Sequence, residues 1–279
     1  MTTVRAYAKV NLAIVVGPAR SDGRHEVVTL LQRIDLHDDV TLDASDELVV
    51  EGFPADTIVR SALESLAGAA HVEPRWRVRI EKRIPVAAGL GGGSTDAAAA
   101  LRLANATLAV PLPDEDLHHL AAGVGADVPF FLGAGTQLAT GDGTQLQPVE
   151  LPLDYHVVLV VPHGVTKGST GAVYERFDAR AGEVGFAERA DALLAALRAI
   201  GSAREVARLP ANDLASSPIA PDLTANGAFR ADVSGAGPTV YGLYEREDDA
   251  ARAASTFAHR GATHVTRPVA ADGSPRVAR

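Results

Sequence analysis

The feature that most constrains this chain is a glycine-rich stretch that joins an alternating apolar segment to an alanine-rich one. It reads Ile84-Pro85-Val86-Ala87-Ala88-Gly89-Leu90-Gly91-Gly92-Gly93-Ser94-Thr95-Asp96. The alternation before it, at residues 76–81, predicts a half-buried strand, and the residues from 96 to about 108 predict a helix. A glycine-rich loop that opens a helix directs bare N–H groups at one spot, where the helix dipole adds positive potential. The stretch therefore predicts a phosphate site, with Ser94, Thr95 or Asp96 capping the helix.

Neither of the two best-known phosphate motifs fits this stretch. A P-loop is excluded because no lysine follows the glycines, and a dinucleotide fingerprint is not supported because the surroundings do not form a full βαβ unit. The alternative is a tight turn from strand to helix, but four glycines followed by serine and threonine exceed what a turn needs. The sequence therefore indicates nucleotide chemistry outside these two motifs.

Charge and cysteine content limit the remaining functions. The 26 Lys and Arg against 35 Asp and Glu give a net charge of −9, which argues against broad binding of nucleic acid or an anionic membrane. The absence of cysteine excludes disulfides, thiolate metal sites and a cysteine nucleophile. Neither a signal-peptide core nor an apolar run of about 18 residues is found, so we expect a soluble cytoplasmic protein.

The rest of the chain mixes helical and strand patterns without strict alternation. Helices are expected after Pro113-Asp114, around residues 193–200 and over 247–259, and a hairpin over 136–148 turns at Gly141-Asp142-Gly143. Further strands are expected at 157–161, 231–233, 239–244 and 263–269. This mixture favours an α+β protein with antiparallel pairing, 279 residues being enough for two domains, at 1–150 and 151–279.

Three other segments place polar residues among apolar ones. Lys9 and Asn11 share one face of a predicted strand, which is either solvent-facing or ligand-facing. Asp127 lies in Gly125-Ala126-Asp127-Val128-Pro129, where it is either a helix-end or turn aspartate or a carboxylate that accepts a proton from, or orients, a substrate hydroxyl. The third segment, Ser234-Gly235-Ala236-Gly237-Pro238, is either a hairpin turn or part of the phosphate site.

Taken together and in this order, these segments resemble the GHMP small-molecule kinases. The resemblance spans residues 4 to about 244, and its branch-specific parts point to the kinases that act on a cytidyl-diphosphate sugar alcohol. The matching segments are Ala8-Lys9-Val10-Asn11-Leu12, Asp22-Gly23-Arg24-His25-Glu26, Glu81 to Thr95, Gly125 to Phe130, Asn212-Asp213-Leu214 and Ser234 to Thr239.

The resemblance implies a fold, a reaction and roles for single residues. The fold is a ribosomal-protein-S5-like N-terminal domain with a ferredoxin-like C-terminal domain, and the reaction is ATP-dependent phosphorylation of an alcohol in isoprenoid-precursor synthesis, with Mg²⁺ arriving on ATP. Asp127 would be the catalytic base, and Lys9 would polarise the hydroxyl and keep Asp127 ionised. Pro85, Val86, Ala87, Ala88, Gly89, Leu90, Gly91, Gly92, Gly93, Ser94 and Thr95 would wrap the ATP phosphates, with Lys82 near adenine.

The resemblance also implies substrate contacts from Asn11 and His25, with His25 at the cytosine edge. Arg24 departs from the family, which usually has a tyrosine there to stack on cytosine; a guanidinium plane can also stack, and Tyr174 stands where the family has its second aromatic. Thr57 replaces a usual asparagine that helps hold the nucleotide base. From the sequence alone, a turn residue is the favoured interpretation of His25, and a core position is an equal alternative for Tyr174.

Two further functions remain open at this point. One is a GHMP kinase for another alcohol, such as a sugar, homoserine or a mevalonate-type substrate, and the other is a catalytically silent nucleotide-binding homologue. Lys9 and Asp127 argue against the silent homologue, whereas Arg24 leaves the choice of alcohol open. The expected partners are the small-molecule substrate and, at most, a second copy of the chain, with no nucleic acid and no membrane.

Overall fold

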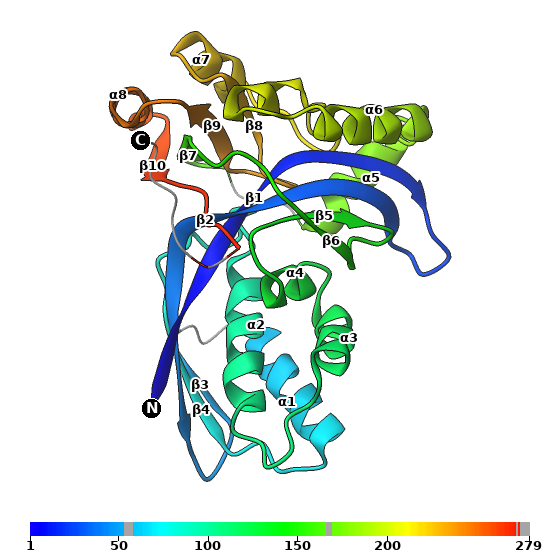
Figure 1. Ribbon diagram of the computed structural model, residues 1–279, viewed down its shortest axis with the longest axis vertical. Coiled ribbons are helices and arrows are strands. Elements are labelled where there is room, and N and C mark those ends of the chain that lie inside the picture. Colours follow the sequence, from blue (N-terminus) through cyan, green and yellow to red (C-terminus); the bar gives the residue numbers. More distant parts are fainter. Residues whose placement is uncertain (53–57, 166–168, 272, 274–279) are drawn as a thin grey trace. The chain divides into compact units, whose positions relative to one another are not determined.

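The computed structural model of the chain describes residues 1–52, 58–165, 169–271 and 273. The chain forms two compact units that interleave in sequence. Unit 1 comprises residues 1–8, 36–86 and 91–133, and unit 2 comprises residues 9–35, 87–90 and 134–279. The long strands β1 (Thr2–Ala19) and β2 (His25–Ala44) therefore contribute to both units (Figure 1). The expected boundary near residue 150 stays a prediction.

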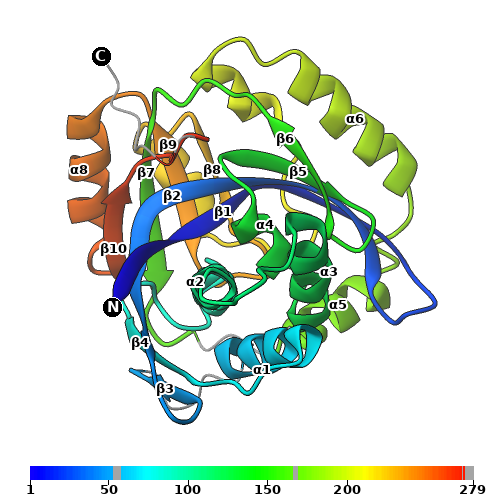
Figure 2. The same cartoon turned by 60° about the horizontal axis from the view of Figure 1, so that its bottom comes forward.

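The described residues of unit 1 combine a small sheet with four helices. The second half of β2 pairs antiparallel with β4 (Trp76–Glu81), and β3 (Val49–Glu51) pairs parallel with β4. The helices are α1 (Ile58–Ala70), α2 (Gly92–Asn105), α3 (Asp114–Val124) and α4 (Val128–Leu132). In Figure 2, α2 is seen nearly along its axis, in contact with α1 and α4. Its alanine-rich sequence fits this position because small side chains let neighbouring helices approach closely.

Unit 2 contains the first half of β2, which pairs with β5 (Thr136–Thr140), and β5 forms the expected hairpin with β6 (Gln145–Val149). It also contains an antiparallel sheet in the order β10-β7-β9-β8. These strands are β7 (His156–Pro162), β8 (Arg230–Val233), β9 (Val240–Tyr244) and β10 (Gly261–Thr266). The helices are α5 (Thr170–Ala179), α6 (Phe186–Arg198), the 3-10 helix η1 (Ala203–Arg208), α7 (Ile219–Ala225) and α8 (Glu247–Phe257).

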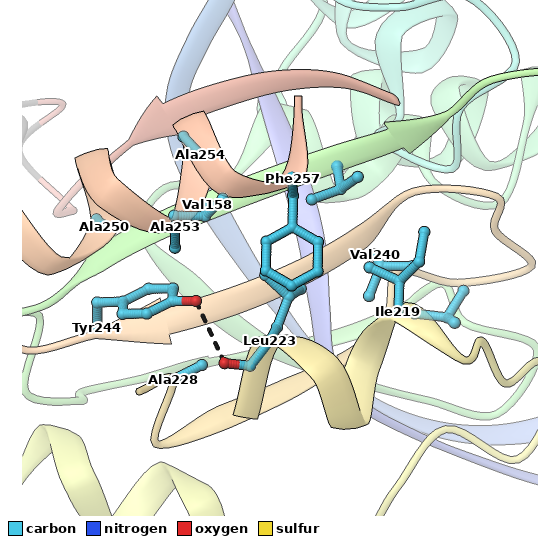
Figure 3. Packing of buried hydrophobic residues seen from close by; sticks show 12 residues of the cluster. Val158, Ile219, Leu223, Ala228, Val240, Tyr244, Ala250, Ala253, Ala254 and Phe257 are labelled. Carbon is cyan, nitrogen blue, oxygen red and sulfur yellow. Dashed lines mark hydrogen bonds between the residues drawn. The ribbon is translucent and has the colours of Figure 1, made fainter. Parts of the chain in front are cut away.

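The core of unit 2 forms where α7 and α8 cover one face of this sheet. Figure 3 shows Phe257 of α8 close to Leu223 of α7, with Val158 and Val240 from the sheet in the same cluster. The hydroxyl of buried Tyr244 donates to the Leu223 carbonyl at 3.4 Å, which satisfies a polar atom that burial would otherwise leave unpaired. This packing fixes the ends of the four strands relative to one another.

The α+β class with antiparallel pairing is confirmed, and so are the expected helices and strands, with ends that shift by a few residues. The sequence patterns did not predict α1, α4, α5, α7, η1, β2 or β3, and they predicted only part of β1. Within the described parts of the chain, no helix is long and apolar enough to cross a membrane.

Candidate active site

The glycine-rich stretch opens α2, but its cap differs from the prediction. Gly91 is the N-cap residue, in left-handed backbone conformation (φ 73°), and no side chain caps the helix. The expected capping by Ser94, Thr95 or Asp96 is wrong because the helix begins at Gly92, which places these residues inside it; the N–H of Thr95 already bonds to the Gly91 carbonyl at 2.9 Å. The first N–H groups of α2 thus have no side-chain acceptor of their own, as an anion site at a helix start requires.

The preceding part of the loop, residues 87–90, is held by unit 2 through its carbonyl oxygens. The Ala88 carbonyl accepts from the Thr239 N–H at 3.3 Å, the Gly89 carbonyl from the Ser234 hydroxyl at 2.9 Å and the Leu90 carbonyl from the Lys9 N–H at 3.0 Å. In a trans peptide the carbonyl and the following N–H point in opposite directions. Three carbonyls turned toward β1 and the 234–239 turn therefore direct the next three N–H groups away from these two segments, an orientation suited to phosphate oxygens.

Gly89 is required at this point of the loop by close approach and by conformation. Its φ is +81°, and a Cβ placed there would lie 2.5 Å from the Ser234 carbonyl oxygen and 2.8 Å from that of Gly237. Both are backbone atoms that cannot move aside without deforming the 234–239 turn. Any larger residue at 89 would therefore break the contacts that orient the loop.

Lys82, just before the loop, lies between two buried carboxylates of unit 1. Its Nζ donates to Asp38 Oδ2 and to Asp96 Oδ2, both at 2.6 Å, and both aspartates have no exposed surface. Asp38 Oδ1 also accepts from the backbone N–H groups of Arg83 and Ile84, at 2.5 and 2.8 Å. The group Asp38–Lys82–Asp96 therefore ties β2, the entry to the loop and α2 together.

Two carboxylates share a single cation in this group, which determines their protonation. Burial raises the pKa of Asp96 to about 8, against the opposing effect of Lys82 and with the help of the Asp38 charge. Burial alone would lower the pKa of Lys82, but the two carboxylates, Asp96 foremost, outweigh it and raise that pKa. Asp96 is consequently protonated at neutral pH. With its Nζ bonded twice, Lys82 keeps at most one N–H for a nucleotide, and the expected adenine contact stays a prediction.

Asp127 is at the start of α4 in unit 1. All five residues of that short helix, Val128 to Leu132, are buried, whereas Asp127 is half-buried and its side chain makes no capping hydrogen bond. The apolar run after it anchors the helix and so holds the carboxylate at its edge. A structural capping role is thus not observed, and the role of catalytic base stays a prediction.

Lys9 and Asn11 are on β1 in unit 2, and the solvent-facing alternative is wrong for both. Their side chains are only 4% and 5% exposed. Lys9 Nζ donates to Asn11 Oδ1 at 2.6 Å, and Asn11 Nδ2 donates to the Thr29 hydroxyl at 2.9 Å. A Cβ on Gly235 would lie 3.0 Å from Asn11 Oδ1 and 3.5 Å from Lys9 Nζ, so that glycine makes room for them. Lys9 and Asp127 belong to different units.

The turn from Ser234 to Thr239 is braced by Asn212. The Asn212 amide donates to the carbonyls of Val233 and Gly235, at 2.9 and 2.7 Å, while its oxygen accepts from the Leu214 N–H at 2.7 Å. The Ser234 hydroxyl, besides bonding to Gly89, accepts from the Asn11 N–H at 3.3 Å. The turn is therefore not an isolated hairpin turn, because it forms hydrogen bonds with both the glycine-rich loop and β1.

His25 and Tyr174 come together in unit 2, and their roles in substrate binding stay predictions. Their rings are 4.7 Å apart and tilted by 34°, and His25 Nε2 lies 2.8 Å from Asp178 Oδ1. His25 is the first residue of β2 and is buried, so it is not a turn residue. Arg24 is more exposed, and its guanidinium pairs with Asp142 of the β5–β6 turn at 2.5 Å. Thr57 lies outside the described residues.

Four residues of this arrangement escaped the sequence analysis as contributors. Asp38 and Thr29 are ordinary members of a strand in the sequence, and only the tertiary pairing brings them to Lys82 and Asn11; Asp96 follows the glycines directly, but its pairing with Lys82 was not expected. Asp178 lies four residues beyond Tyr174, on the same face of α5, and this i,i+4 spacing was a usable signal once Tyr174 had been singled out. In the described ranges no cluster of three His, Cys, Asp or Glu side chains could hold a metal ion.

Comparison with known proteins gives a consistent result. Residues 57–135 match the GHMP kinases N terminal domain and residues 222–263 match the GHMP kinases C terminal domain. A protein of Chlorobium phaeobacteroides named 4-diphosphocytidyl-2-C-methyl-D-erythritol kinase is 34% identical over 95% of this chain and 97% of its own. A protein of the same name from Corynebacterium efficiens is 39% identical over 85% and 83% of the two chains.

Among solved structures, a crystal structure of 4-(cytidine 5'-diphospho)-2C-methyl-D-erythritol kinase superposes with a TM-score of 0.76 at 31% sequence identity. The superposition covers 96% of this chain and 99% of the other. Sequence and structure comparisons thus point to the same relatives across almost the whole chain.

Proposed function

Because the chain belongs to the 4-diphosphocytidyl-2-C-methyl-D-erythritol kinases of the GHMP kinase family, we propose that it transfers the γ-phosphate of ATP to the 2-hydroxyl of 4-diphosphocytidyl-2-C-methyl-D-erythritol. The observation that carries the proposal is the glycine-rich loop. Its three carbonyls at 88–90 are bonded to unit 2, its next N–H groups face away, and the uncapped start of α2 follows directly. This combination suits the phosphates of a nucleotide and needs no lysine in the loop.

The reaction asks mainly for positioning and charge stabilisation. Residues 85–95 would hold the triphosphate through backbone N–H groups while the substrate oxygen attacks the γ-phosphorus and the bond to the β-phosphate oxygen breaks. Asp127 would accept the hydroxyl proton, a task for which a carboxylate of ordinary basicity suffices because the proton leaves as the O–P bond forms. Lys9 would donate to the reacting hydroxyl, and its fixed position on Asn11 supports this role. Mg²⁺ would arrive bound to ATP.

The cytidine end of the substrate would meet His25 and Tyr174. Their rings are adjacent, and the hydrogen bond between His25 and Asp178 holds His25 in position; both observations support a role in binding the base. Because the neutral ring carries one donor and one acceptor nitrogen, His25 can pair with a cytosine edge through the nitrogen that does not contact Asp178. Arg24 would then stack on or flank the base once its exposed pair with Asp142 opens, a pair that is worth little in water.

The test is ADP release from ATP and Mg²⁺ with 4-diphosphocytidyl-2-C-methyl-D-erythritol, run beside homoserine, galactose, mevalonate and no acceptor. We expect turnover with the cytidyl substrate alone. Turnover with another alcohol and none with the cytidyl substrate would contradict the substrate assignment while keeping the kinase. No turnover with any acceptor, by protein that still binds ATP, would contradict the kinase assignment.

A further inference from the structure

Unit 2 contains a cavity of about 470 Å³ at one end of its antiparallel sheet. Four lining residues mark strand ends: Pro162 ends β7, Val233 ends β8, Pro238 precedes β9 and Arg260 precedes β10. The N–H of His163 donates to the Arg260 carbonyl at 3.0 Å and so links the end of β7 to the start of β10. None of Lys9, Asn11, Arg24, His25 and Tyr174 lines the cavity, although Tyr174 packs in the same apolar cluster as the lining residues Val173, Ala215 and Ala236, so the cavity adjoins this proposed substrate residue without including it.

The polar lining of this cavity fits an anion. Its ionisable side chains are His163, Arg176 and Arg260, and no carboxylate lines it, although acidic residues outnumber basic ones by 35 to 26 in the chain. Arg260 pairs with Asp222, outside the lining, at 3.1 Å, whereas no carboxylate in the described part of the chain pairs with Arg176. Ser216 and Ser217 add hydroxyls on the same lining. Arginine and hydroxyl donors together favour a ligand with several oxyanions, such as a phosphate ester.

The apolar lining fits the rest of such a ligand. Val173, Ile219 and Val233 line the cavity with side chains that are almost fully buried in the core, and three prolines, Pro162, Pro218 and Pro238, widen the apolar surface. A small inorganic anion would leave this surface wet and would not fill the volume. The combination of an apolar wall with few convergent polar groups is typical of sites for small organic molecules.

The position of the cavity gives its occupant a route to the glycine-rich loop. Ala236, Gly237 and Pro238 line it, and they belong to the turn whose Ser234 and Thr239 hold the carbonyls of Gly89 and Ala88. We propose that the cavity binds an organic phosphate or diphosphate with a small apolar group, and that this occupant changes the affinity of the loop for ATP through the 234–239 turn. The regulatory half of this proposal rests on the proposed function, whereas the binding half does not.

The binding half is tested by calorimetric titration of hexyl diphosphate into protein saturated with Mg²⁺ and a non-hydrolysable ATP analogue, so that the loop itself is occupied. We expect one binding site per chain, weakened at least tenfold by Arg176→Ala and by Ser216→Phe, which fills the cavity from an exposed position. The matched control is Arg198→Ala, since Arg198 is also an exposed arginine in the last turn of a helix, α6, away from the cavity. Inorganic diphosphate and hexanol should each bind at least tenfold more weakly.

Absence of binding, equal loss in Arg176→Ala and Arg198→Ala, or equally tight binding of inorganic diphosphate would overturn the binding half. For the regulatory half, hexyl diphosphate should change the KM for ATP in wild type and in Arg198→Ala but not in Ser216→Phe; an equal change in Ser216→Phe, or none in wild type, would overturn it. If no variant turns over any acceptor while hexyl diphosphate still binds as described, the proposed function fails and the site stands.

Discussion

The buried group Asp38–Lys82–Asp96 leads to a prediction in which substitutions of two equally buried aspartates have different effects on stability. Asp96→Asn should raise the free energy of unfolding at pH 7 by about 4 kcal/mol, because wild type must take up a proton at Asp96 on folding, whereas asparagine is neutral in both states and its amide oxygen can still accept from Lys82. Asp38→Asn should cost about 3–5 kcal/mol, because it removes the charged partner of a buried ammonium and disturbs two backbone hydrogen bonds at the entry to the loop.

The stability of wild type and that of Asp96→Asn should also differ in their dependence on pH. The pKa of Asp96 is raised from 3.8 to about 8 by folding, so between these values the folded chain keeps a proton that the unfolded chain has lost. Its contribution is therefore most favourable at low pH and falls by about 1.4 kcal/mol per pH unit until the pH passes the folded pKa. Wild type should lose about 3 kcal/mol relative to Asp96→Asn between pH 5 and pH 7.5.

Urea denaturation followed by the fluorescence of Trp76 measures this difference. Trp76 is the single tryptophan, is buried in β4 of unit 1 and donates from Nε1 to the Thr107 hydroxyl at 3.0 Å. Asp116→Asn, at an exposed position of α3, is the matched control and should follow wild type at every pH. Parallel curves for wild type and Asp96→Asn from pH 5 to pH 7.5 would refute the assignment of the proton to Asp96.

The remaining predictions concern the proposed reaction. Asp127→Asn should lower kcat by orders of magnitude with little change in ATP affinity measured by calorimetry, and turnover near the wild-type rate would refute its role as base. Lys9→Ala should also lower kcat strongly, whereas an effect on KM alone in the ADP-release assay would mean that Lys9 only binds. Gly89→Ala should weaken ATP binding at least tenfold because its Cβ meets the backbone of the 234–239 turn, and unchanged binding would show that the loop is not held there. Arg24→Tyr should keep or improve the KM for the cytidyl substrate, and a severe loss would give Arg24 a contact of its own.

Much of the fold could be predicted because its signals are local. The alternation of Trp76, Val78 and Ile80 and the glycine turn at 141–143 specify a strand and a hairpin without help from distant residues. The helix α1 was missed although the sequence contains both signals for it: Asp56 and Thr57 directly precede it, and its buried residues, such as Val59 and Leu63, recur at helical spacing. The lengths of β1 and β2 depend on partners far along the chain, which no local pattern contains.

The candidate site likewise has features that could be predicted from the sequence and features that could not. The loop was predictable because glycines and the start of a helix have the same meaning wherever they occur. The burial of Lys9 and Asn11 was not predictable, because an alternating polar pair fits an exposed strand face as well as a ligand-facing one, and the Ser234–Thr239 turn that contacts Asn11 lies far along the chain. The capping prediction failed for a related reason: Gly91, which has no side chain to recognise as a cap, begins the helix by its left-handed conformation.

The net charge of the chain shows how far composition can be used for anion binding. A charge of −9 counts whole side chains, and beyond a Debye length of about 8 Å in physiological salt most of its effect is screened. The loop proposed for ATP phosphates uses backbone N–H groups that this sum does not include, and the cavity of unit 2 gathers Arg176 and Arg260 without a lining carboxylate. The acidic balance therefore argues against broad polyanionic surfaces but has no bearing on these two small sites, whose affinity should depend on salt only weakly compared with that of a nucleic-acid-binding protein.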